Sequence, residues 1–509
     1  MKRFKTVFAQ WFSRRRILYS GIGVFLVLLV VFAGIFSFLS CNNTRDSIKQ
    51  YNLIVICVDT LRADHVGCYG YKRDTTPRID SMAKEGILFE NASSNSSFTR
   101  ESVPVILTGQ LPSVSGSTGW FAKPSTKVKG MGTLFKEAGY KTAFFAATNT
   151  MRFPEYTQGF DVFDHYSESK VSGNSPELSR MAIDFIGKNK NNTFMMYLHY
   201  LDPHGPYDPP LDFYKKFSPI VFPEPVGIYN HVRMMCEQLI SEGFGPGEKR
   251  YEDLVLRYDA EIAHTDYSIG MVLDKLKELE ILDNTVIVLT SDHGEEFLEH
   301  RFVEHGWTLF KEVTHVPLIF WGKPFSKPIR IAQPVSSVYI LPTVLSALNI
   351  PHQRSDFDGH PLFSIKNGDV TFIPVVKPYI GELLVQHRNV LRAVVKDNWK
   401  YFASASWTLP ENRPSRLIID IDQFELTPSL HVGTWNPIRY EALYDLTTDP
   451  GEKTNVIASN PAKRDELRKI LDQYEARCKL FHKGEIRQGN TRPALSPEEI
   501  KKLKSLGYM

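Results

Sequence analysis

Three residues with metal-binding side chains follow apolar runs of the chain. Asp59 comes directly after residues 52–58, and Asp292 and His293 follow residues 285–290. Two carboxylates and an imidazole suit Zn²⁺, Mn²⁺ or a similar divalent ion. Taken singly, each aspartate could equally stand in a turn or cap a helix. If the two runs are neighbouring strands, however, the three side chains converge at one edge of a sheet, and together they predict a metal site.

A hydroxyl group that could act as a nucleophile stands at the start of a short helical pattern. Thr99 precedes residues 100–107, in which Pro104 falls near the first turn, where proline is tolerated. A hydroxyl there lies at the positive end of the helix dipole, and contact with a metal ion would lower its pKa further. Threonine is also a favoured N-cap for purely structural reasons. Thr99 is therefore either an ordinary cap or a nucleophile beside the metal.

The elements that must position these residues alternate between strand and helix patterns. Apolar runs typical of buried strands lie at residues 52–58, 194–200, 285–290 and 316–321, and helical patterns lie at residues 176–188 and 251–279. This alternation predicts an α/β domain whose mostly parallel sheet is flanked by helices. In such sheets the ligand crevice lies at the carboxyl ends of the strands, where the polar residues of this chain occur.

The pattern changes beyond about residue 370. Short strand-like pieces at residues 390–395 and 399–403 are followed by a helical pattern at residues 461–483. At 509 residues the chain is also too long for one simple core. We therefore expect a large α/β domain over residues 50–370 and a smaller C-terminal α+β subdomain over residues 371–509.

The first forty residues indicate a membrane anchor. Residues 17–39 are uncharged over 23 positions, enough at about 1.5 Å per residue to cross a hydrocarbon core of roughly 30 Å. Lysine and arginine cluster in residues 1–16, which the positive-inside rule places in the cytoplasm. We expect a single transmembrane helix at residues 17–40, with the remainder on the periplasmic or another extracytoplasmic side. A cleaved signal peptide, whose apolar core usually has about 7 to 15 residues, and a lipid on Cys41 are the alternatives.

Charge and cysteine content exclude some classes of protein. Lysine and arginine number 60 against 57 acidic residues, so the net charge of +3 gives no reason to expect a nucleic-acid partner. The five cysteines are scattered and odd in number, which does not indicate a disulfide framework. The oligomeric state is unknown at this stage.

Four strings resemble successive hallmarks of the sulfatase family, within the alkaline phosphatase superfamily. They lie at residues 58–70, 202–207, 290–295 and 443–452. Their order also matches that family, and the resemblance runs from about residue 52 to the end of the chain. It implies an alkaline phosphatase-like fold and metal-dependent cleavage of sulfate or phosphate esters.

The chain departs from the sulfatase pattern at the nucleophile. In that family a cysteine or serine nine residues before a Thr-Gly pair is oxidised to formylglycine, and here Thr99 stands nine residues before Thr108. The proline and arginine of the motif are absent, and Thr60 replaces the second aspartate of the usual pair. We therefore expect no formylglycine. The combination of Asp59, Thr99 and the Asp292-His293 pair is similar instead to the sites of the phosphoethanolamine transferase and lipoteichoic acid synthase branches. Those branches work through a phosphorylated threonine. They usually carry glutamate where this chain has Asp59.

These similarities imply roles for individual residues. One divalent ion, of unknown identity among Zn, Mn, Mg and Ca, would be held by Asp59, Thr99, Asp292 and His293. His204 and His305 match histidines that bind substrate or handle the proton of the leaving group, for which an imidazole pKa near about 6.5 is suited. Arg100 would contact the anionic substrate in place of the missing motif arginine.

The expected reaction is hydrolysis of a phosphate or sulfate ester by Thr99. A phosphate ester or diester is favoured over a sulfate ester, because a threonine ester lacks the elimination route that releases sulfate from formylglycine. The alternatives are a sulfatase, a transferase that passes a phospho-group to an envelope lipid or glycan, and a catalytically silent protein that binds an anion. The expected partners are the membrane, through the N-terminal helix, and a sulfated or phosphorylated glycan, lipid or small molecule.

Overall fold

A computed structural model describes residues 50–117, 128–147, 157–165, 175–218, 245–366, 369–375, 377–385, 389–404 and 440–481. The expected transmembrane helix at residues 17–40 lies outside these ranges. Within them, no helix combines the length and the apolar character that crossing a membrane requires.

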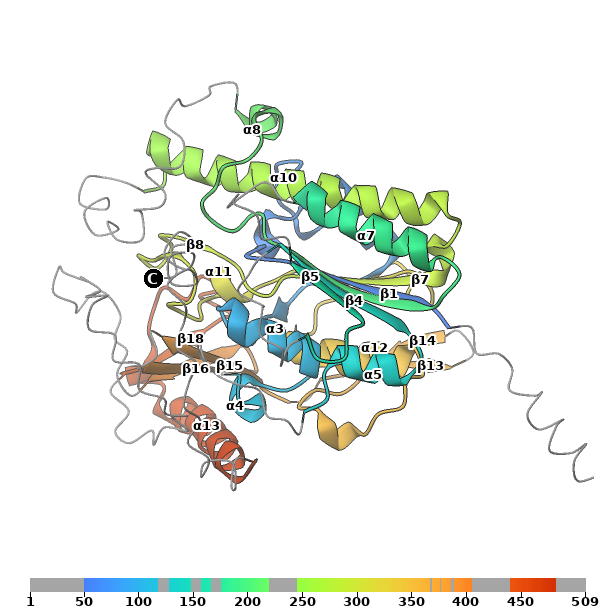
Figure 1. Ribbon diagram of the computed structural model, residues 1–509. Coiled ribbons are helices and arrows are strands. Elements are labelled where there is room, and N and C mark those ends of the chain that lie inside the picture. Colours follow the sequence, from blue (N-terminus) through green and yellow to red (C-terminus); the bar gives the residue numbers. More distant parts are fainter. Residues whose placement is uncertain are drawn as a thin grey trace, which may run out of the picture. The chain divides into compact units, whose positions relative to one another are not determined.

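An eight-stranded sheet organises the larger part of the structure (Figure 1). Its order is β11-β2-β10-β7-β1-β6-β4-β5. The strands are β1 (Asn52–Val58), β2 (Ile87–Phe89), β4 (Lys141–Ala146), β5 (Val162–His165), β6 (Phe194–Tyr200), β7 (Thr285–Thr290), β10 (Leu318–Trp321) and β11 (Ile329–Ile331). Among these eight, β10 alone runs against the others, antiparallel to β7 and β2. The sheet is therefore mixed but mostly parallel, as expected.

The three central strands β6, β1 and β7 are buried along their whole length. Apolar side chains on both faces explain why these segments are continuous apolar runs without alternation. Their observed bounds equal the predicted runs, whereas β10 begins two residues later than predicted. Val316, two residues before β10, donates its backbone amide outside the sheet, to the Ala92 carbonyl.

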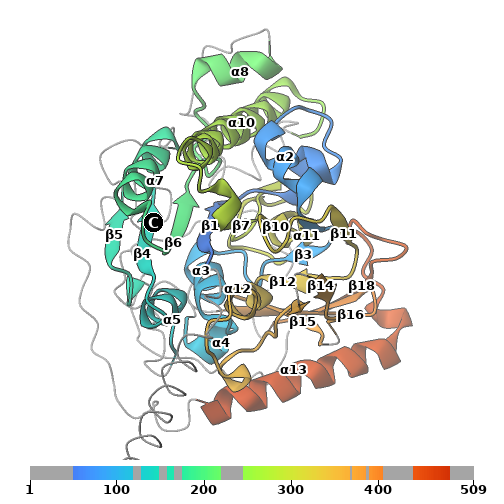
Figure 2. The ribbon, with the colours of Figure 1, turned by 90° about the vertical axis from the view of Figure 1, so that its right-hand side faces the viewer.

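Helices cover both faces of the sheet (Figures 1 and 2). On one face pack α2 (Pro77–Glu85), α7 (Ser175–Asn189) and α10 (Lys249–Glu278), with α8 (Leu211–Phe217) on α10. On the other face pack α3 (Thr99–Thr108), α5 (Met131–Glu137) and α12 (Ile340–Ala347). The short helices are α4 (Pro112–Ser115) and α11 (Lys311–Thr314). The predicted helices at residues 176–188 and 251–279 are confirmed within two residues at each end.

Proline 104 lies deeper in its helix than predicted. It is inside α3 rather than near the first turn. Its missing amide removes one bond from the helical ladder. Every residue of α3 is buried, so packing on the sheet stabilises the helix in spite of that loss.

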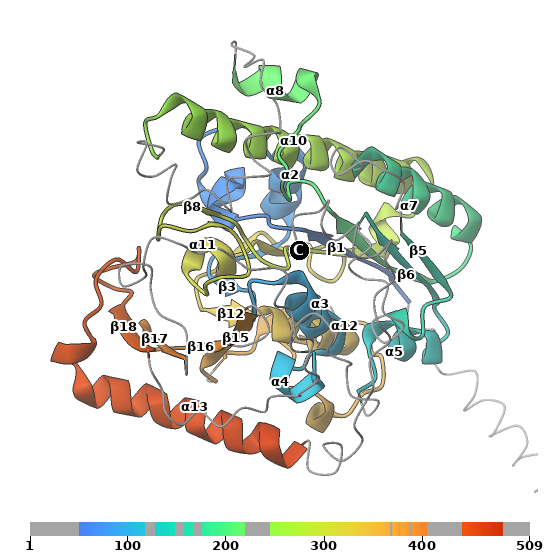
Figure 3. The ribbon, with the colours of Figure 1, turned by 60° about the vertical axis from the view of Figure 1, so that its left-hand side comes forward.

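The C-terminal part has an α+β architecture, as expected (Figure 3). An antiparallel sheet has the order β15 (Tyr379–Val385), β16 (Asn389–Lys396), β17 (Trp399–Ser404) and β18 (Tyr440–Asp445). Helix α13 (Pro461–Phe481) packs on it through Leu467 and Leu471, which belong to the same apolar cluster as Val394 and Tyr401. The remaining strands pair as β3 (Ala92–Ser93) with β12 (Val335–Ser336), β8 (Glu296–Phe297) with β9 (Val303–Glu304), and β13 (Phe363–Lys366) with β14 (Asp369–Phe372).

The register of the central strands brings three chain segments together at one edge. Cys57 of β1 pairs with His199 of β6 on one side and with Thr290 of β7 on the other. The residues that follow these pairs leave the sheet at the same edge. Asp59 and Asp292 therefore reach the carboxyl ends of neighbouring parallel strands, as the sequence predicted.

Candidate active site

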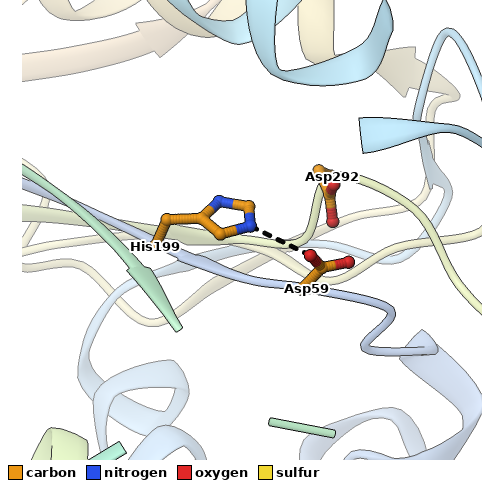
Figure 4. Close-up of side chains that lie close together, drawn as sticks. All are labelled: Asp59, His199 and Asp292. Carbon is orange, nitrogen blue, oxygen red and sulfur yellow. Dashed lines mark hydrogen bonds and ion pairs between the residues drawn. The ribbon is translucent and has the colours of Figure 1, made fainter. Parts of the chain in front are cut away.

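A cluster of three potential metal ligands lies at this edge of the sheet (Figure 4). One ligand atom from each of Asp59, His199 and Asp292 lies within 4.8 Å of the others, and all three residues are buried. His199 Nε2 is 3.1 Å from Asp59 Oδ2. His199 was not among the residues predicted from the sequence. In the sequence it stands out only as a polar residue near the end of the apolar run at residues 194–200. That run forms β6, the strand beside β1, which leads to Asp59.

His293 and Thr99 complete the cluster. His293 Nε2 is 3.6 Å from Asp59 Oδ1, 3.4 Å from Asp292 Oδ2 and 3.1 Å from Thr99 Oγ1. Its Nδ1 is 3.0 Å from the Gly294 carbonyl oxygen, which can only accept, so Nδ1 carries the proton. The lone pair of Nε2 then faces the three oxygens. This is the tautomer of a metal-binding histidine, fixed by a backbone carbonyl.

Three of the separations among these atoms match those of ligands on one divalent ion. Bonds of about 2.1 Å put neighbouring ligand atoms ~3.4 Å apart in a tetrahedron and ~3.0 Å apart in an octahedron. The separations from His199 to Asp59, and from His293 to Asp59 and Asp292, are 3.1, 3.6 and 3.4 Å. Asp59 Oδ1 is also buried without a hydrogen-bond partner. A cation would satisfy this acceptor, which is otherwise costly to bury.

The charges in the cluster also favour a cation. Burial and the negative charge of Asp59 raise the pKa of Asp292 to about 6. Burial opposes ionisation of Asp59 as well, but the hydrogen bond from His199 and the nearby imidazoles lower the pKa of Asp59 below its usual value. Two buried carboxylates this close repel each other when both are ionised, and a divalent ion would remove that repulsion.

Thr99 is not an ordinary helix cap. It is the first residue of α3, whose N-cap position is Phe98. The Thr99 hydroxyl instead donates to His293 Nε2, at 3.1 Å. Of the two interpretations that the sequence left open, the structure supports a hydroxyl that belongs to the cluster.

Thr60, which stands where the sulfatase pattern has a second aspartate, has a left-handed backbone. Its φ of 57° is unfavourable for a β-branched residue. The Tyr258 hydroxyl donates to its carbonyl at 2.6 Å, and the next amide, of Leu61, donates to Ser291 Oγ at 3.0 Å. These bonds hold the backbone directly after Asp59 and so fix where that carboxylate lies.

Two further histidines predicted from the sequence lie against the cluster. The His305 ring centroid is 4.3 Å from that of His293 and 4.8 Å from that of His204. His204 Nδ1 donates to the Gly205 carbonyl at 2.6 Å, and burial lowers the pKa of His204 although the charge of Asp59 opposes this. The structure therefore brings both histidines to the site.

A buried carboxylate supports His305. Glu295 Oε1 is 2.9 Å from His305 Nδ1, and the Tyr207 hydroxyl donates to Glu295 Oε2 at 2.9 Å. Burial, with the nearby charge of Glu304, raises the pKa of Glu295 well above its usual value. Glu295 lies in the third string that resembles the sulfatase family, at residues 290–295, but no role was predicted for it.

Arg100, the predicted substrate-binding residue, directly follows Thr99 in the sequence and is buried. It is the second residue of α3 and is 5% exposed. Arg62, which follows Asp59 closely in the sequence, has a different place. Its guanidinium pairs with Asp64 and Glu299 and so fixes the loop.

Residues 51–350 match the family model described as Sulfatase. The chain belongs to the sulfatase family. It is therefore an ester hydrolase, and the resemblance found in the sequence is confirmed.

Similar sulfatases occur in bacteria. The "Uncharacterized sulfatase YidJ" of Escherichia coli (strain K12) is 25% identical over 346 residues, which are 59% of this chain and 68% of that protein. The N-acetylglucosamine-6-O-sulfatase of Bacteroides thetaiotaomicron is 23% identical over 539 residues, covering 87% of this chain and 89% of that protein.

Solved structures share the fold. One, in complex with its substrate D-glucosamine-2-N,6-O-disulfate, has a TM-score of 0.66 at 20% identity and covers 87% of this chain and 100% of that chain. The phosphonate monoester hydrolase of Agrobacterium radiobacter has a TM-score of 0.61 at 16% identity, with coverage of 84% and 96%. The fold of this sulfatase-family chain is thus alkaline phosphatase-like.

Proposed function

We propose that this sulfatase-family protein hydrolyses phosphate esters, phosphodiesters above all, through Thr99 as nucleophile at a single divalent metal ion. The observation that carries the proposal is the position of the Thr99 hydroxyl. It lies 3.1 Å from His293 Nε2, at the place in the chain where other family members carry formylglycine.

The proposed metal ligands are those expected from the sequence, with one addition. They are Asp59, Thr99, Asp292 and His293, joined by His199. When bound, a divalent ion would lower the pKa of the Thr99 hydroxyl and neutralise charge on the oxygens of the transferred group. Two imidazoles among the donors favour Zn²⁺ or Mn²⁺ over Ca²⁺ and Mg²⁺, which prefer oxygen ligands.

The residues around Thr99 supply the remaining steps. A bond forms from Thr99 Oγ1 to phosphorus as the bond to the leaving alcohol breaks, and the hydroxyl proton passes to water. His305 protonates the leaving oxygen, with His204 beside it, and Arg100 binds the non-bridging oxygens. Water then attacks phosphorus and returns Thr99 to its hydroxyl form. If an acceptor hydroxyl took the place of that water, the protein would be a phosphotransferase.

Sulfate-ester hydrolysis is the second candidate, and the relatives favour it. One is named as an N-acetylglucosamine-6-O-sulfatase, and a structure with the same fold binds a disulfated glucosamine. Phosphate is nevertheless preferred, because Thr99 cannot release sulfate by the elimination open to formylglycine. In either case the substrate class is a phosphorylated or sulfated glycan, lipid or small molecule.

We also propose that residues 17–40 anchor the protein, with the catalytic domain on the extracytoplasmic side. The support is the uncharged stretch of 23 residues behind a basic segment. The full chain should remain in the membrane fraction after an alkaline wash. Recovery of a soluble product that lacks residues 1–40 would favour a signal peptide instead.

A kinetic comparison tests the proposed reaction. The full chain, purified in detergent with Mn²⁺ or Zn²⁺, should cleave bis(p-nitrophenyl) phosphate faster than p-nitrophenyl sulfate. Thr99→Ala should lower kcat by at least about a thousandfold, as loss of a nucleophile does. Thr108→Ala, at the far end of α3, is the matched control and should retain activity. Unchanged turnover in Thr99→Ala contradicts the nucleophile, and faster cleavage of the sulfate supports the second candidate.

A further inference from the structure

Two loops far apart in the sequence meet on one carboxylate. His204 and Tyr207 lie in the loop after β6, and His305 follows β9. Glu295 Oε2 accepts from the Tyr207 hydroxyl at 2.9 Å, while Glu295 Oε1 lies 2.9 Å from His305 Nδ1. One side chain thus contacts both loops that bring a histidine to the site.

We propose that Glu295 is a positioning residue for protonation of the leaving group. It holds His305 with Nε2 directed to the leaving oxygen and, through Tyr207, keeps the loop of His204 against it. This inference rests on the proposed function, in which His305 supplies that proton.

The contacts of the His305 ring limit its orientation. With Nδ1 bound to Glu295, rotation of the ring would break that bond, so the proton transfer falls to Nε2. The ring also packs between His293 and His204, at centroid distances of 4.3 and 4.8 Å. A hydrogen-bond partner fixed at Nδ1 holds the ring in one orientation and leaves Nε2 to face the leaving oxygen.

Burial stabilises the hydrogen bonds of Glu295 to His305 and Tyr207. The residue is 0% exposed, so water does not compete for its two hydrogen bonds. Its own backbone is also fixed, because Arg62 Nη1 donates to the Glu295 carbonyl at 3.0 Å. Arg62 is in turn paired with Asp64 and Glu299. These contacts hold the backbone of Glu295 in place.

The next residue offers a matched control. Glu296 is a glutamate of equal burial, but its Oε2 accepts a hydrogen bond from Thr308 at 2.8 Å. Adjacent residues of an extended segment point to opposite sides, which explains why its partner is not His305. A substitution of Glu296 therefore perturbs the same segment without touching the bond to the histidine.

The test uses esters that differ only in the leaving group. Protonation matters most for a poor leaving group such as an alkyl or p-methoxyphenyl alcohol, and least for p-nitrophenol. In the full-length protein, Glu295→Gln should lower kcat about 10- to 100-fold for the poor leaving groups, within the range of supporting residues in other sites, and less than about threefold for p-nitrophenol. KM should change little in both cases. Tyr207→Phe, which removes one of the two bonds, should give a smaller effect with the same dependence.

Several results would overturn the inference. Equal losses for all leaving groups in Glu295→Gln would indicate a merely structural role, and so would an equal, leaving-group-dependent loss in Glu296→Gln. The series is run with phosphate or sulfate esters, whichever the wild type cleaves. If the inference fails alone, wild-type turnover and its dependence on Thr99 remain. A wild type that cleaves neither class overturns the proposed function as well.

Discussion

His199 adds a second imidazole to a cluster that otherwise holds carboxylates, one imidazole and a hydroxyl. Its Nε2 is 3.1 Å from Asp59 Oδ2, and the residue is fully buried. In the proposed site this nitrogen would complete the metal's ligand set and direct the choice of ion toward Zn²⁺ or Mn²⁺.

His199→Ala should therefore weaken Zn²⁺ binding by at least about tenfold, since even supporting residues of metal sites contribute that much. Competition with a chromophoric chelator measures the affinity, and elemental analysis gives the stoichiometry. His352→Ala is the control, because that half-buried histidine hydrogen bonds the Ile350 carbonyl away from the cluster. Equal affinity in wild type and His199→Ala would remove His199 from the ligand set.

The sequence predicted part of the site because some of its residues follow apolar runs or lie near recognisable strings. Asp59 and Asp292 directly follow apolar runs, and His204 and His305 lie in or near strings that resemble a known family. His199 could not be found in the same way, because it lies within an apolar run whose other residues form the core. Glu295 supports a histidine ten residues later, and no local pattern indicates such a contact.

At the scale of elements, the N-terminus of α2 is held by another helix. Asp266 of α10 accepts hydrogen bonds from the amides of Arg78 and Ile79 at 3.0 and 2.9 Å. The N-cap residue, Thr76, makes no capping bond of its own. Burial raises the pKa of Asp266 to about 7. The folded protein therefore binds a proton there more tightly than the unfolded chain does.

This pKa predicts a pH dependence of stability. A raised carboxyl pKa contributes stability that is fully present below the unfolded pKa of about 3.9 and is lost as the pH rises toward 7. From about pH 5 to about pH 7, wild type should lose on the order of 1–2 kcal/mol of unfolding free energy relative to Asp266→Asn, which does not titrate. Urea denaturation at several pH values measures the difference. A difference that stays constant with pH would contradict the assignment.

The sequence predicted the buried strands better than their directions. The runs that became β1, β6 and β7 are apolar on both faces, so their bounds were evident from composition. Strand β10 has the same character, yet it runs antiparallel to β7. Direction depends on how the chain returns to the sheet, and composition of the strand itself carries no information about that return.

At the scale of the whole described structure, a buried ion pair links the C-terminal strands to other elements. Glu382 of β15 pairs with Arg392 of β16 at 2.6 Å. The same carboxylate accepts from Ser113 of α4 at 2.7 Å and from Tyr474 of α13 at 2.6 Å. The α+β character of this part was predictable from its short strands. The link was not, because its four residues are scattered along the sequence.

Breaking the pair of Glu382 and Arg392 should lower the free energy of unfolding considerably. Arg392→Met leaves Glu382 buried without its cation, and loss of one partner of a buried pair costs about 3–5 kcal/mol of unfolding free energy. The exposed pair of Arg180 and Glu177 on α7 is the control, for which Arg180→Met should cost less than about 1 kcal/mol. Urea denaturation of both variants gives the comparison. Similar costs for the two would show that the buried pair is not a structural link.

The central claim is that Thr99 carries the transferred group during turnover, and intact-mass spectrometry tests it most directly. The full-length protein would be mixed with excess phosphodiester in the presence of Zn²⁺ or Mn²⁺ and quenched in acid during turnover. The account predicts a mass increase equal to the substrate minus its leaving alcohol, located by peptide mapping at Thr99 and absent in Thr99→Ala. An unmodified Thr99 in an enzyme that is turning over, or the same adduct in Thr99→Ala, would contradict it.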